Sequence, residues 1–400
     1  MAIKKIKTNP FDEQEFIDDL LYPLQDIVAE TNYNVLSVIS NRLNKVGNMS
    51  ASDAQRLSQI VRMQDLAEIK LEIAKGTKKT LAEVDKILDS AAEKNDQLSE
   101  NLYVYRGMNP SSFKLDKRLG LIVNEARKSI KDDIINLSKT SVMHLSFLKT
   151  KVPIEKAYNY AINRGILEVT SGITNYQAAI RSIISEFAND GMWSVIYKSG
   201  FEKRLDSAVR MNVLGGVSML NQEYRREQGR QYGADGIELS AHALSEPIHA
   251  MYQGKQYSLQ EFDRIQSSLE RPFFEMNCRH SSFPIILGIS EPAYSGNELS
   301  DYKKRSEKEV EFDTLQKDKD GNVITKKISR YDASQVQRNI ETDIRRLKDQ
   351  RNQLDKVNDN VAVAELNKQI KSKTVYYKQI SEQVGLSPKL NRLTVYDGRK

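Results

Sequence analysis

Apolar residues recur at three- and four-residue spacing through much of the first hundred positions. Phe16, Leu20 and Leu24 follow this spacing, which places their side chains on one face of a helix. Pro23 lies inside the same run, and because proline has no backbone N–H we expect it to kink this helix or to begin a new one. The pattern predicts helix over most of residues 11–100.

Glycine-containing segments are expected to divide the helical regions. Residues 47–53 are mostly small and polar and are predicted as a connection, and residues 76–80 as a second break. Further along the chain, apolar spacing favours helices at 141–147 and at 152–164. Gly165 is expected to end the second of these helices.

The next stretch combines a short extended segment with a long helix. Residues 191–200 are rich in β-branched and aromatic side chains between two glycines, which favours a strand. A long helix is expected over Arg204–Glu227. Gly215 and Gly216 lie inside it, and each costs about 1 kcal/mol relative to alanine in a helix interior. We therefore expect these glycines to permit close helix packing or a kink.

After residue 230 the pattern changes to short elements. Residues 236–241 and 283–288 are predicted as strands, with a helix between them at 259–269. Residues 309–315 and 323–328 are predicted to form a hairpin, because the intervening Asp-Gly pair supplies the positive φ angles of a tight turn.

The C-terminal region returns to helix. Residues 334–383 carry charges of both signs at helical spacing and are predicted as an antiparallel pair broken near 358–360. The expected fold class is therefore mainly α. It comprises an elongated helical region over 1–230, a small α+β module over 231–300, and a β-hairpin with a C-terminal helical pair over 301–400.

The composition fits a soluble globular protein with a polar surface. Hydrophobic residues make up 39% of the 400 residues and charged residues 28%. No run approaches the ~20 apolar residues of a membrane-spanning helix. The N-terminus has basic residues but lacks the apolar core and cleavage site of a secretory signal, so we expect synthesis in the cytoplasm and no membrane contact during assembly.

The charge balance is only modestly basic. The chain has 60 basic and 54 acidic side chains, with a formal net charge of +6. A balance of this kind tolerates polyanions, but only a clustered basic face would indicate nucleic-acid binding.

Three of the four histidines fall close to the sole cysteine, in the order His242, His249, Cys278, His280. Imidazole nitrogen and thiolate sulfur are zinc ligands, and zinc takes four of them in a tetrahedron. Cys278 and His280 are two residues apart and would point to the same side of an extended segment. These four residues are candidate ligands of a structural zinc ion.

Two other interpretations of this cluster stay open. The histidines could satisfy hydrogen bonds in a small polar core, with Cys278 buried as a small hydrophobic residue. Cys278 beside His280 could also act as a thiolate–imidazole pair, although residues two apart seldom reach the required geometry. The sequence contains no P-loop, no paired-histidine zinc-protease helix and no serine elbow.

One enzymatic alternative comes from Tyr103–Gly107, which looks like the arginine-containing strand that opens many ADP-ribosyltransferase domains. Residues 307–309 and 309–311 imitate the closing acidic pair of that family. However, the region between is predicted to be helical and contains no convincing Ser-Thr-Ser strand.

Several longer stretches of the last two-thirds of the chain resemble one known family. They are Tyr197–Met211, Gly233–His242, Tyr252–Ser258, Asn277–Ser281, Pro284–Tyr294, Ser334–Arg345 and Val384–Arg392. In this order they resemble phage minor capsid proteins of the "minor capsid protein 2" type, which are related to phage head-morphogenesis proteins. The family pattern also has histidine at His242, His249 and His280 and cysteine at Cys278.

The resemblance implies a non-enzymatic virion component. It would be made in the host cytoplasm and carried in few copies in the head interior or at the portal vertex. Its implied partners are the portal protein, other capsid proteins and packaged double-stranded DNA, bound without sequence preference. Alternative functions are an ADP-ribosyltransferase-like or other effector domain carried in the particle, and a cytoplasmic DNA-binding protein.

Contact with DNA or the portal would use basic side chains on helix faces, because such side chains pair with phosphates independently of sequence. The candidates are Arg204, Arg210, Arg225, Arg226, Arg230, Arg345, Arg346, Lys348 and Arg351.

Overall fold

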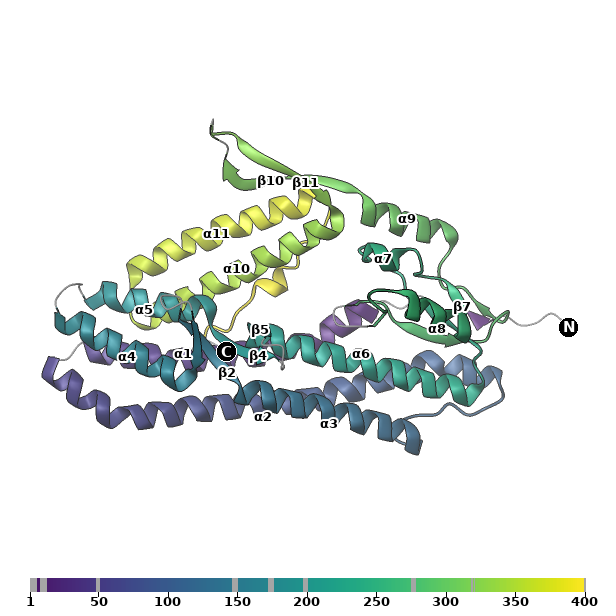
Figure 1. Cartoon of the computed structure of the whole chain (residues 1–400), viewed down its shortest axis with the longest axis horizontal. Coiled ribbons are helices and arrows are strands. Elements are labelled where there is room, and N and C mark those ends of the chain that lie inside the picture. The colour runs from purple at the N-terminus through teal and green to yellow at the C-terminus, as the bar shows by residue number, and fades with distance from the viewer. Residues whose placement is uncertain are drawn as a thin grey trace. The chain divides into compact units, whose positions relative to one another are not determined.

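The fold is dominated by helices, with a few small sheets (Figure 1), which confirms the mainly α prediction. It is known from a computed structural model. The residues that the structure describes are 6–7, 13–47, 51–145, 150–171, 176–196, 201–274, 278–317, 319 and 321–398.

The helices and strands follow one another along the chain in a mixed order. The helices are α1 (Glu13–Gly47), α2 (Ala51–Tyr105), α3 (Lys117–Lys139), α4 (Ile154–Ser171), α5 (Tyr176–Asp190), α6 (Leu205–Tyr232), α7 (Pro247–Ala250), α8 (Leu259–Ser268), α9 (Gly296–Glu307), α10 (Arg330–Lys356), α11 (Asn360–Gln383) and the 3₁₀ helix η2 (Leu390–Leu393). The strands are β1 (Ile6–Lys7), β2 (Ser141–Leu145), β3 (Thr150–Pro153), β4 (Met192–Ile196), β5 (Phe201–Arg204), β6 (Gly236–Leu239), β7 (Gln256–Ser258), β8 (Ser282–Ile285), β9 (Ser290–Glu291), β10 (Glu309–Lys317) and β11 (Val323–Ser329).

The chain forms two compact units, each assembled from three separate segments. Unit 1 comprises Met1–Tyr22, Ala82–Asp133 and Met211–Gln335, and unit 2 comprises Pro23–Leu81, Ile134–Arg210 and Val336–Lys400. The domain boundaries expected near residues 230 and 300 are not tested by this division and stay predictions.

In unit 2, the segment predicted as a helix at 141–147 begins with a strand. Strand β2 lies in a four-stranded antiparallel sheet of order β3-β2-β4-β5. Ser141 and Met143 are buried while Val142 between them is partly exposed, so burial alternates with the two-residue period of a strand. The strand expected within 191–200 is confirmed by β4.

The glycines expected to end helices lie inside continuous helices instead. Helix α2 passes through Gly76, where an added Cβ would lie 2.0 Å from Oγ1 of Thr31 in α1. Helix α4 passes through Gly165, where a Cβ would lie 2.8 Å from Leu43. These predicted breaks were wrong because both glycines permit close approach of a second helix, which outweighs their low helix propensity. Helix α1 likewise passes through Pro23 without a new helix beginning there.

Unit 1 contains the small α+β elements, and the predicted strands and helix are confirmed. Strands β7, β6 and β8 form an antiparallel sheet in that order. Helix α8 begins with a capping box, in which Ser258 accepts from the backbone N–H of Glu261 and the Glu261 carboxylate accepts from the N–H of Ser258. Such reciprocal bonds satisfy two donors that a helix start leaves free.

The predicted hairpin and helical pair are also confirmed. Strands β10 and β11 pair antiparallel, and Gly321 in their turn has a φ of 87°. Helices α10 and α11 are separated at Asn358, whose φ is 59°. Asp359 then caps α11 by accepting a hydrogen bond from the backbone N–H of Ala362 at 3.0 Å.

Candidate metal centre

Sheet pairing in unit 1 brings two of the predicted ligands to one place. Leu239, at the end of β6, pairs with Ser282 at the start of β8, and the backbone N–H of Ser240 donates to the carbonyl of Ser281 at 2.8 Å. Because the strands are antiparallel, the residues after β6 lie beside those before β8. His242 and His280 are therefore neighbours, with ring centroids 4.5 Å apart.

His249 reaches the same place from the single-turn helix α7. Its side chain is 1% exposed, and its ring stacks on that of Phe273 with centroids 4.1 Å apart. Phe273 also lies edge-on to His280, with centroids 5.1 Å apart. Phe273 belongs to the hydrophobic cluster around β6 and α8, so apolar side chains form one wall of the site.

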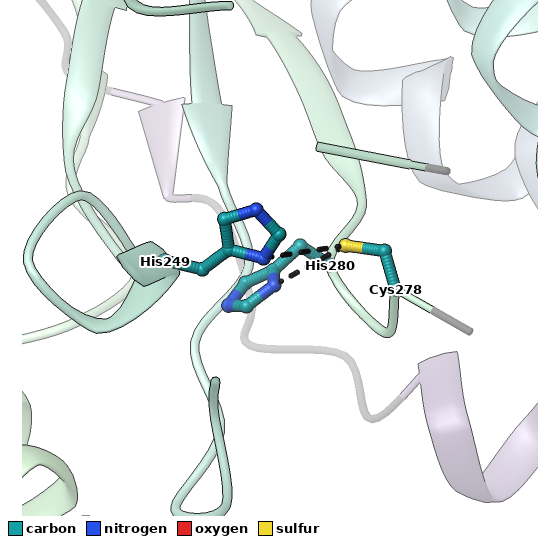
Figure 2. A group of neighbouring side chains, drawn as sticks. All are labelled: His249, Cys278 and His280. Atoms are coloured by element: carbon teal, nitrogen blue, oxygen red, sulfur yellow. Dashed lines mark hydrogen bonds between the residues drawn. The ribbon is translucent and has the colours of Figure 1, made fainter. Parts of the chain in front are cut away.

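The Cys278 sulfur faces one nitrogen of each of two histidines (Figure 2). Its Sγ lies 3.8 Å from Nδ1 of His249 and 3.6 Å from Nδ1 of His280. The three candidate ligand atoms all lie within 4.8 Å of one another. The structure therefore brings together three of the four residues selected from the sequence, with His242 beside them.

The other nitrogen of each histidine contacts a protein oxygen. Nε2 of His249 lies 2.9 Å from the backbone carbonyl oxygen of Arg271. Nε2 of His280 lies 3.2 Å from Oε1 of Gln253, which also accepts from the backbone N–H of His242 at 3.0 Å. A carbonyl oxygen only accepts hydrogen bonds, so Nε2 of each neutral ring carries the hydrogen. Each Nδ1 then presents a lone pair to the sulfur.

Burial favours the uncharged forms of His242, Cys278 and His280. It lowers the pKa of His280 to about 2 and that of His242 to about 3. Burial also raises the pKa of the Cys278 thiol, so without a cation the residue stays a thiol at neutral pH. A thiol is a poor nucleophile compared with a thiolate, which weighs against the catalytic thiolate–imidazole pair.

The partners of the histidines were not found from the sequence. Gln253 is 2% exposed and Ser245 is fully buried, and both contact Nε2 of His280. Gln253 lies within the Tyr252–Ser258 stretch that carries the family resemblance, which is the signal that could have selected it. The carbonyl of Arg271 gives no such signal, because every residue has a backbone carbonyl.

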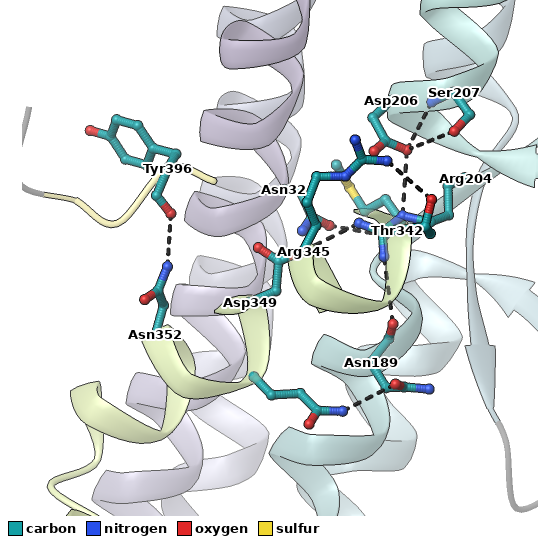
Figure 3. Close-up of polar contacts among 12 residues, drawn as sticks. Asn32, Asn189, Arg204, Asp206, Ser207, Thr342, Arg345, Asp349, Asn352 and Tyr396 are labelled. Carbon is teal, nitrogen blue, oxygen red and sulfur yellow. Dashed lines mark hydrogen bonds and ion pairs between the residues drawn. The ribbon is translucent and has the colours of Figure 1, made fainter. Parts of the chain in front are cut away.

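The basic candidate Arg204 of unit 2 lies among acidic and polar side chains (Figure 3). It is 9% exposed, and its guanidinium lies 3.3 Å from the carboxylate of Asp349 and 3.4 Å from that of Asp206. We assign Arg204 to this interior cluster and no longer to a DNA-contacting face.

The candidates on α6 in unit 1 differ in exposure. Arg225 is 5% exposed, donates to Oδ1 of Asn95 at 2.7 Å, and lies over the ring of Phe283 at 4.3 Å. Its role is therefore also internal. Arg226 and Arg230 are exposed, and Arg230 forms a 2.7 Å ion pair with Glu227 one turn earlier.

Two of the candidates on α10 donate hydrogen bonds to backbone carbonyls of the C-terminal segment of unit 2. Arg345 donates to the carbonyl of Arg392 at 3.2 Å and to Oγ1 of Thr342 at 3.3 Å. Lys348 donates to the carbonyl of Leu393 at 2.7 Å. Both side chains are partly exposed, and their hydrogen bonds indicate a structural role.

The remaining candidates are partly exposed. Arg346 lies 3.9 Å from the carboxylate of Asp343, and Arg351 donates to Oδ1 of Asn352 at 3.0 Å. Arg210 near the start of α6 is also partly exposed. Several of the basic candidates are therefore occupied by contacts within their own unit.

The strand required by the ADP-ribosyltransferase alternative is absent. Residues 103–105 form the last turn of α2, and Nε of Arg106 donates to the carbonyl of Tyr232 at 3.0 Å. In the acidic segment, Glu309 pairs with Lys327 across the hairpin at 2.7 Å. These residues have structural contacts in place of the expected strand.

Comparison with known proteins gives one result for nearly the whole chain. No helix in the described ranges is long and apolar enough to span a membrane. No curated protein and no solved structure shows significant similarity to the chain. A sequence model of one family, phage minor capsid protein 2, matches residues 14–380.

Proposed function

The chain belongs to the phage minor capsid protein 2 family, and from this premise we propose that it is a structural or assembly component of the phage head at or near the portal. It acts without catalysis, is present in few copies per particle, and resides in the head interior or at the portal vertex. The match over residues 14–380 carries this proposal. Virion location follows from the family itself, and the portal vertex is the finer part of the proposal.

Helix α11 of unit 2 offers a surface suited to another helical protein. Its buried residues are Ala362, Leu366, Tyr377, Ile380 and Ser381. The exposed residues include Val361 at 74% and Val375 at 59%, among lysines and glutamates. Apolar side chains surrounded by charges of both signs are typical of protein-binding surfaces with a polar rim. We propose this surface for contact with the portal or a neighbouring capsid protein.

The proposal extends to packaged DNA only through exposed basic residues. Arg226 and Arg230 on α6 are exposed, and guanidinium groups in such positions bind phosphates without sequence preference. The buried Arg204 and Arg225 are excluded from this contact.

The deciding experiment counts this chain against the portal protein by quantitative mass spectrometry of purified procapsids and mature virions. We expect a few copies per portal in both particles. The major capsid protein serves as the internal reference for particle number. Absence of the chain from both particles would contradict the proposal, whereas loss from DNA-filled particles alone would indicate an assembly factor that leaves.

The α11 surface is tested with the variant Val375→Lys in phage that lack the wild-type copy. A positive charge placed in an apolar contact should lower the copy number per particle. The matched control is Val323→Lys on β11 of unit 1, where the valine is 50% exposed. Equal incorporation of both variants would remove α11 from the proposed interface.

A further inference from the structure

We propose that unit 1 binds one zinc ion through Nδ1 of His249, Sγ of Cys278 and Nδ1 of His280, with His242 supplying the fourth ligand. This inference stands on the geometry of the cluster and does not depend on the proposed role in the phage head.

The hydrogen count of the cluster supports a bound cation. The lone pairs of two Nδ1 atoms face the Cys278 sulfur at 3.8 and 3.6 Å, and a thiol has a single hydrogen to donate. One buried nitrogen is therefore left facing sulfur without a donor, which is costly in a protein interior. A metal ion accepts both lone pairs, and the thiol loses its proton to solvent to become the third ligand.

The distances fit a tetrahedral zinc site. Zinc lies ~2.3 Å from thiolate sulfur and ~2.0 Å from imidazole nitrogen, so tetrahedral angles separate these ligand atoms by roughly 3.6 Å. The observed separations of 3.8 and 3.6 Å match this value. Sulfur with imidazole nitrogen favours zinc over magnesium or calcium, which prefer oxygen ligands.

The surroundings of the histidines hold them in the ligating form. The Arg271 carbonyl accepts from Nε2 of His249, and Oε1 of Gln253 accepts from Nε2 of His280. Metal-bound histidines commonly donate their second N–H to such an oxygen, which fixes both the tautomer and the ring orientation. The arrangement is therefore that of two histidines already oriented for a metal.

His242 provides an independent indication. In the described part of the chain, its Nε2 is buried and has no hydrogen-bond partner. Its ring lies 4.5 Å from that of His280, centroid to centroid. An unpartnered buried nitrogen on the ring next to His280 is explained if it completes a four-coordinate site. Four protein ligands leave no position for water, so the site is structural rather than catalytic.

The ion would bind residues from three segments that lie outside the β7-β6-β8 sheet. His242 follows β6, His249 lies on the four-residue helix α7, and Cys278 and His280 precede β8. Binding in the folded state but not in the unfolded chain stabilises the fold by mass action. The proposed ion therefore fixes the loops at one end of the β7-β6-β8 sheet.

The test uses the full-length chain, expressed with zinc and purified without chelator. Metal analysis should give about one zinc per chain for the wild type. Cys278→Ser and His280→Ala should bind near zero, whereas His144→Ala, which changes the histidine outside this cluster, should keep one. Zinc near zero in the wild type, or unchanged zinc in Cys278→Ser, would overturn the proposal.

Cobalt substitution separates ligand loss from misfolding. Cobalt added to metal-free wild-type protein should give the intense absorption of a thiolate–cobalt bond together with the visible bands of a tetrahedral ion. Cys278→Ser should lose the thiolate absorption while its circular dichroism stays helical. His242→Ala should keep the thiolate absorption but bind zinc at least tenfold more weakly. Unchanged affinity in His242→Ala would refute the four-ligand assignment.

Discussion

Each unit buries a polar cluster, and the two clusters differ in how far protein groups alone satisfy them. In unit 2 the Arg204 guanidinium lies within 3.4 Å of two carboxylates, those of Asp206 and Asp349. In unit 1 the two imidazole nitrogens of His249 and His280 share one thiol. Buried polar groups are almost always paired. A cluster whose groups are paired is therefore structural, whereas the cluster that lacks a donor is the one for which we propose a bound cation.

In the unit 2 cluster, Arg204 and Arg345 both act on the two acids, Asp206 and Asp349. Burial acts to raise the pKa of Asp206, but Arg204 and Arg345 hold that pKa below its usual value. Burial raises the pKa of Asp349 to about 6, although Arg204 opposes this shift. The acid with the weaker compensation therefore titrates close to neutral pH.

The largest expected effect comes from removing the shared cation. Arg204→Met leaves the buried carboxylate of Asp349 and the partly buried carboxylate of Asp206 without this guanidinium, and removing one partner of a buried ion pair costs about 3–5 kcal/mol. The free energy of unfolding in urea measures this loss. Trp193, the sole tryptophan, lies on β4 in register with Arg204, so its fluorescence reports on unit 2.

The control for this variant is Arg226→Met, which removes an exposed guanidinium and should change the free energy of unfolding by less than about 0.5 kcal/mol. If Arg204→Met were equally mild, the unit 2 cluster would not be held together by its charges. The contrast with the unit 1 cluster would then be lost.

The second effect is a pH dependence that Asp349→Asn removes. The folded pKa of about 6 lies above the ~3.9 of an unfolded aspartate, so the folded state takes up a proton first as the pH falls. As the pH falls from about 7 to about 4, the free energy of unfolding of the wild type should therefore increase by about 2 kcal/mol relative to that of the variant. Urea unfolding at one-unit pH steps measures the difference. Parallel curves for wild type and Asp349→Asn would contradict the assignment.

The third effect tests the oxygen acceptors behind the proposed zinc ligands. Gln253→Leu removes Oε1, which fixes the tautomer of His280. Loss of such a partner typically costs 10–100-fold in metal affinity. Ser245 still contacts Nε2 of His280 at 3.2 Å, so we expect the low end, about tenfold. Competition with a zinc-binding dye measures the affinity.

Gln222→Leu on α6 is the matched control for this measurement, because Gln222 donates to Ser218 and lies outside the cluster. Equal zinc affinity of the two variants would mean that Gln253 does not orient His280.

The sequence predicted elements whose causes are local. The hairpin was predicted from the Asp-Gly pair in the sequence, and Gly321 has the expected positive φ. Helix α8 begins where Ser258 and Glu261 satisfy each other's backbone N–H groups. The breaks at Gly76 and Gly165 were mispredicted because their cause is distant in sequence. Each glycine accommodates a side chain of another helix, and helix propensity contains no information about that neighbour.

The same distinction applies to the candidate site. Cys278 and His280 are close in sequence and rare in type, so composition and spacing were sufficient to select them. Their acceptors, Gln253 and the carbonyl of Arg271, come from other segments. The exposure of an arginine is equally invisible in sequence, since Arg225 and Arg226 are adjacent yet one is buried and the other exposed.

The smallest expected effect on stability belongs to Arg226→Ala. This variant compares an exposed arginine with the buried Arg225 next to it. An exposed arginine contributes within about 0.5 kcal/mol to folding, so urea unfolding should barely change. Affinity for DNA falls as the salt concentration rises. If Arg226 binds a phosphate of packaged DNA, the variant should make the slope of log affinity against log salt concentration less steep by about 1. Retention on double-stranded DNA of mixed sequence, at a series of salt concentrations, measures this slope.

Arg225→Ala should show the opposite behaviour, with lower stability but an unchanged slope, because its guanidinium is used inside unit 1. An unchanged slope in Arg226→Ala would remove this residue from the proposed DNA contact and leave Arg230 as its remaining basic candidate on α6.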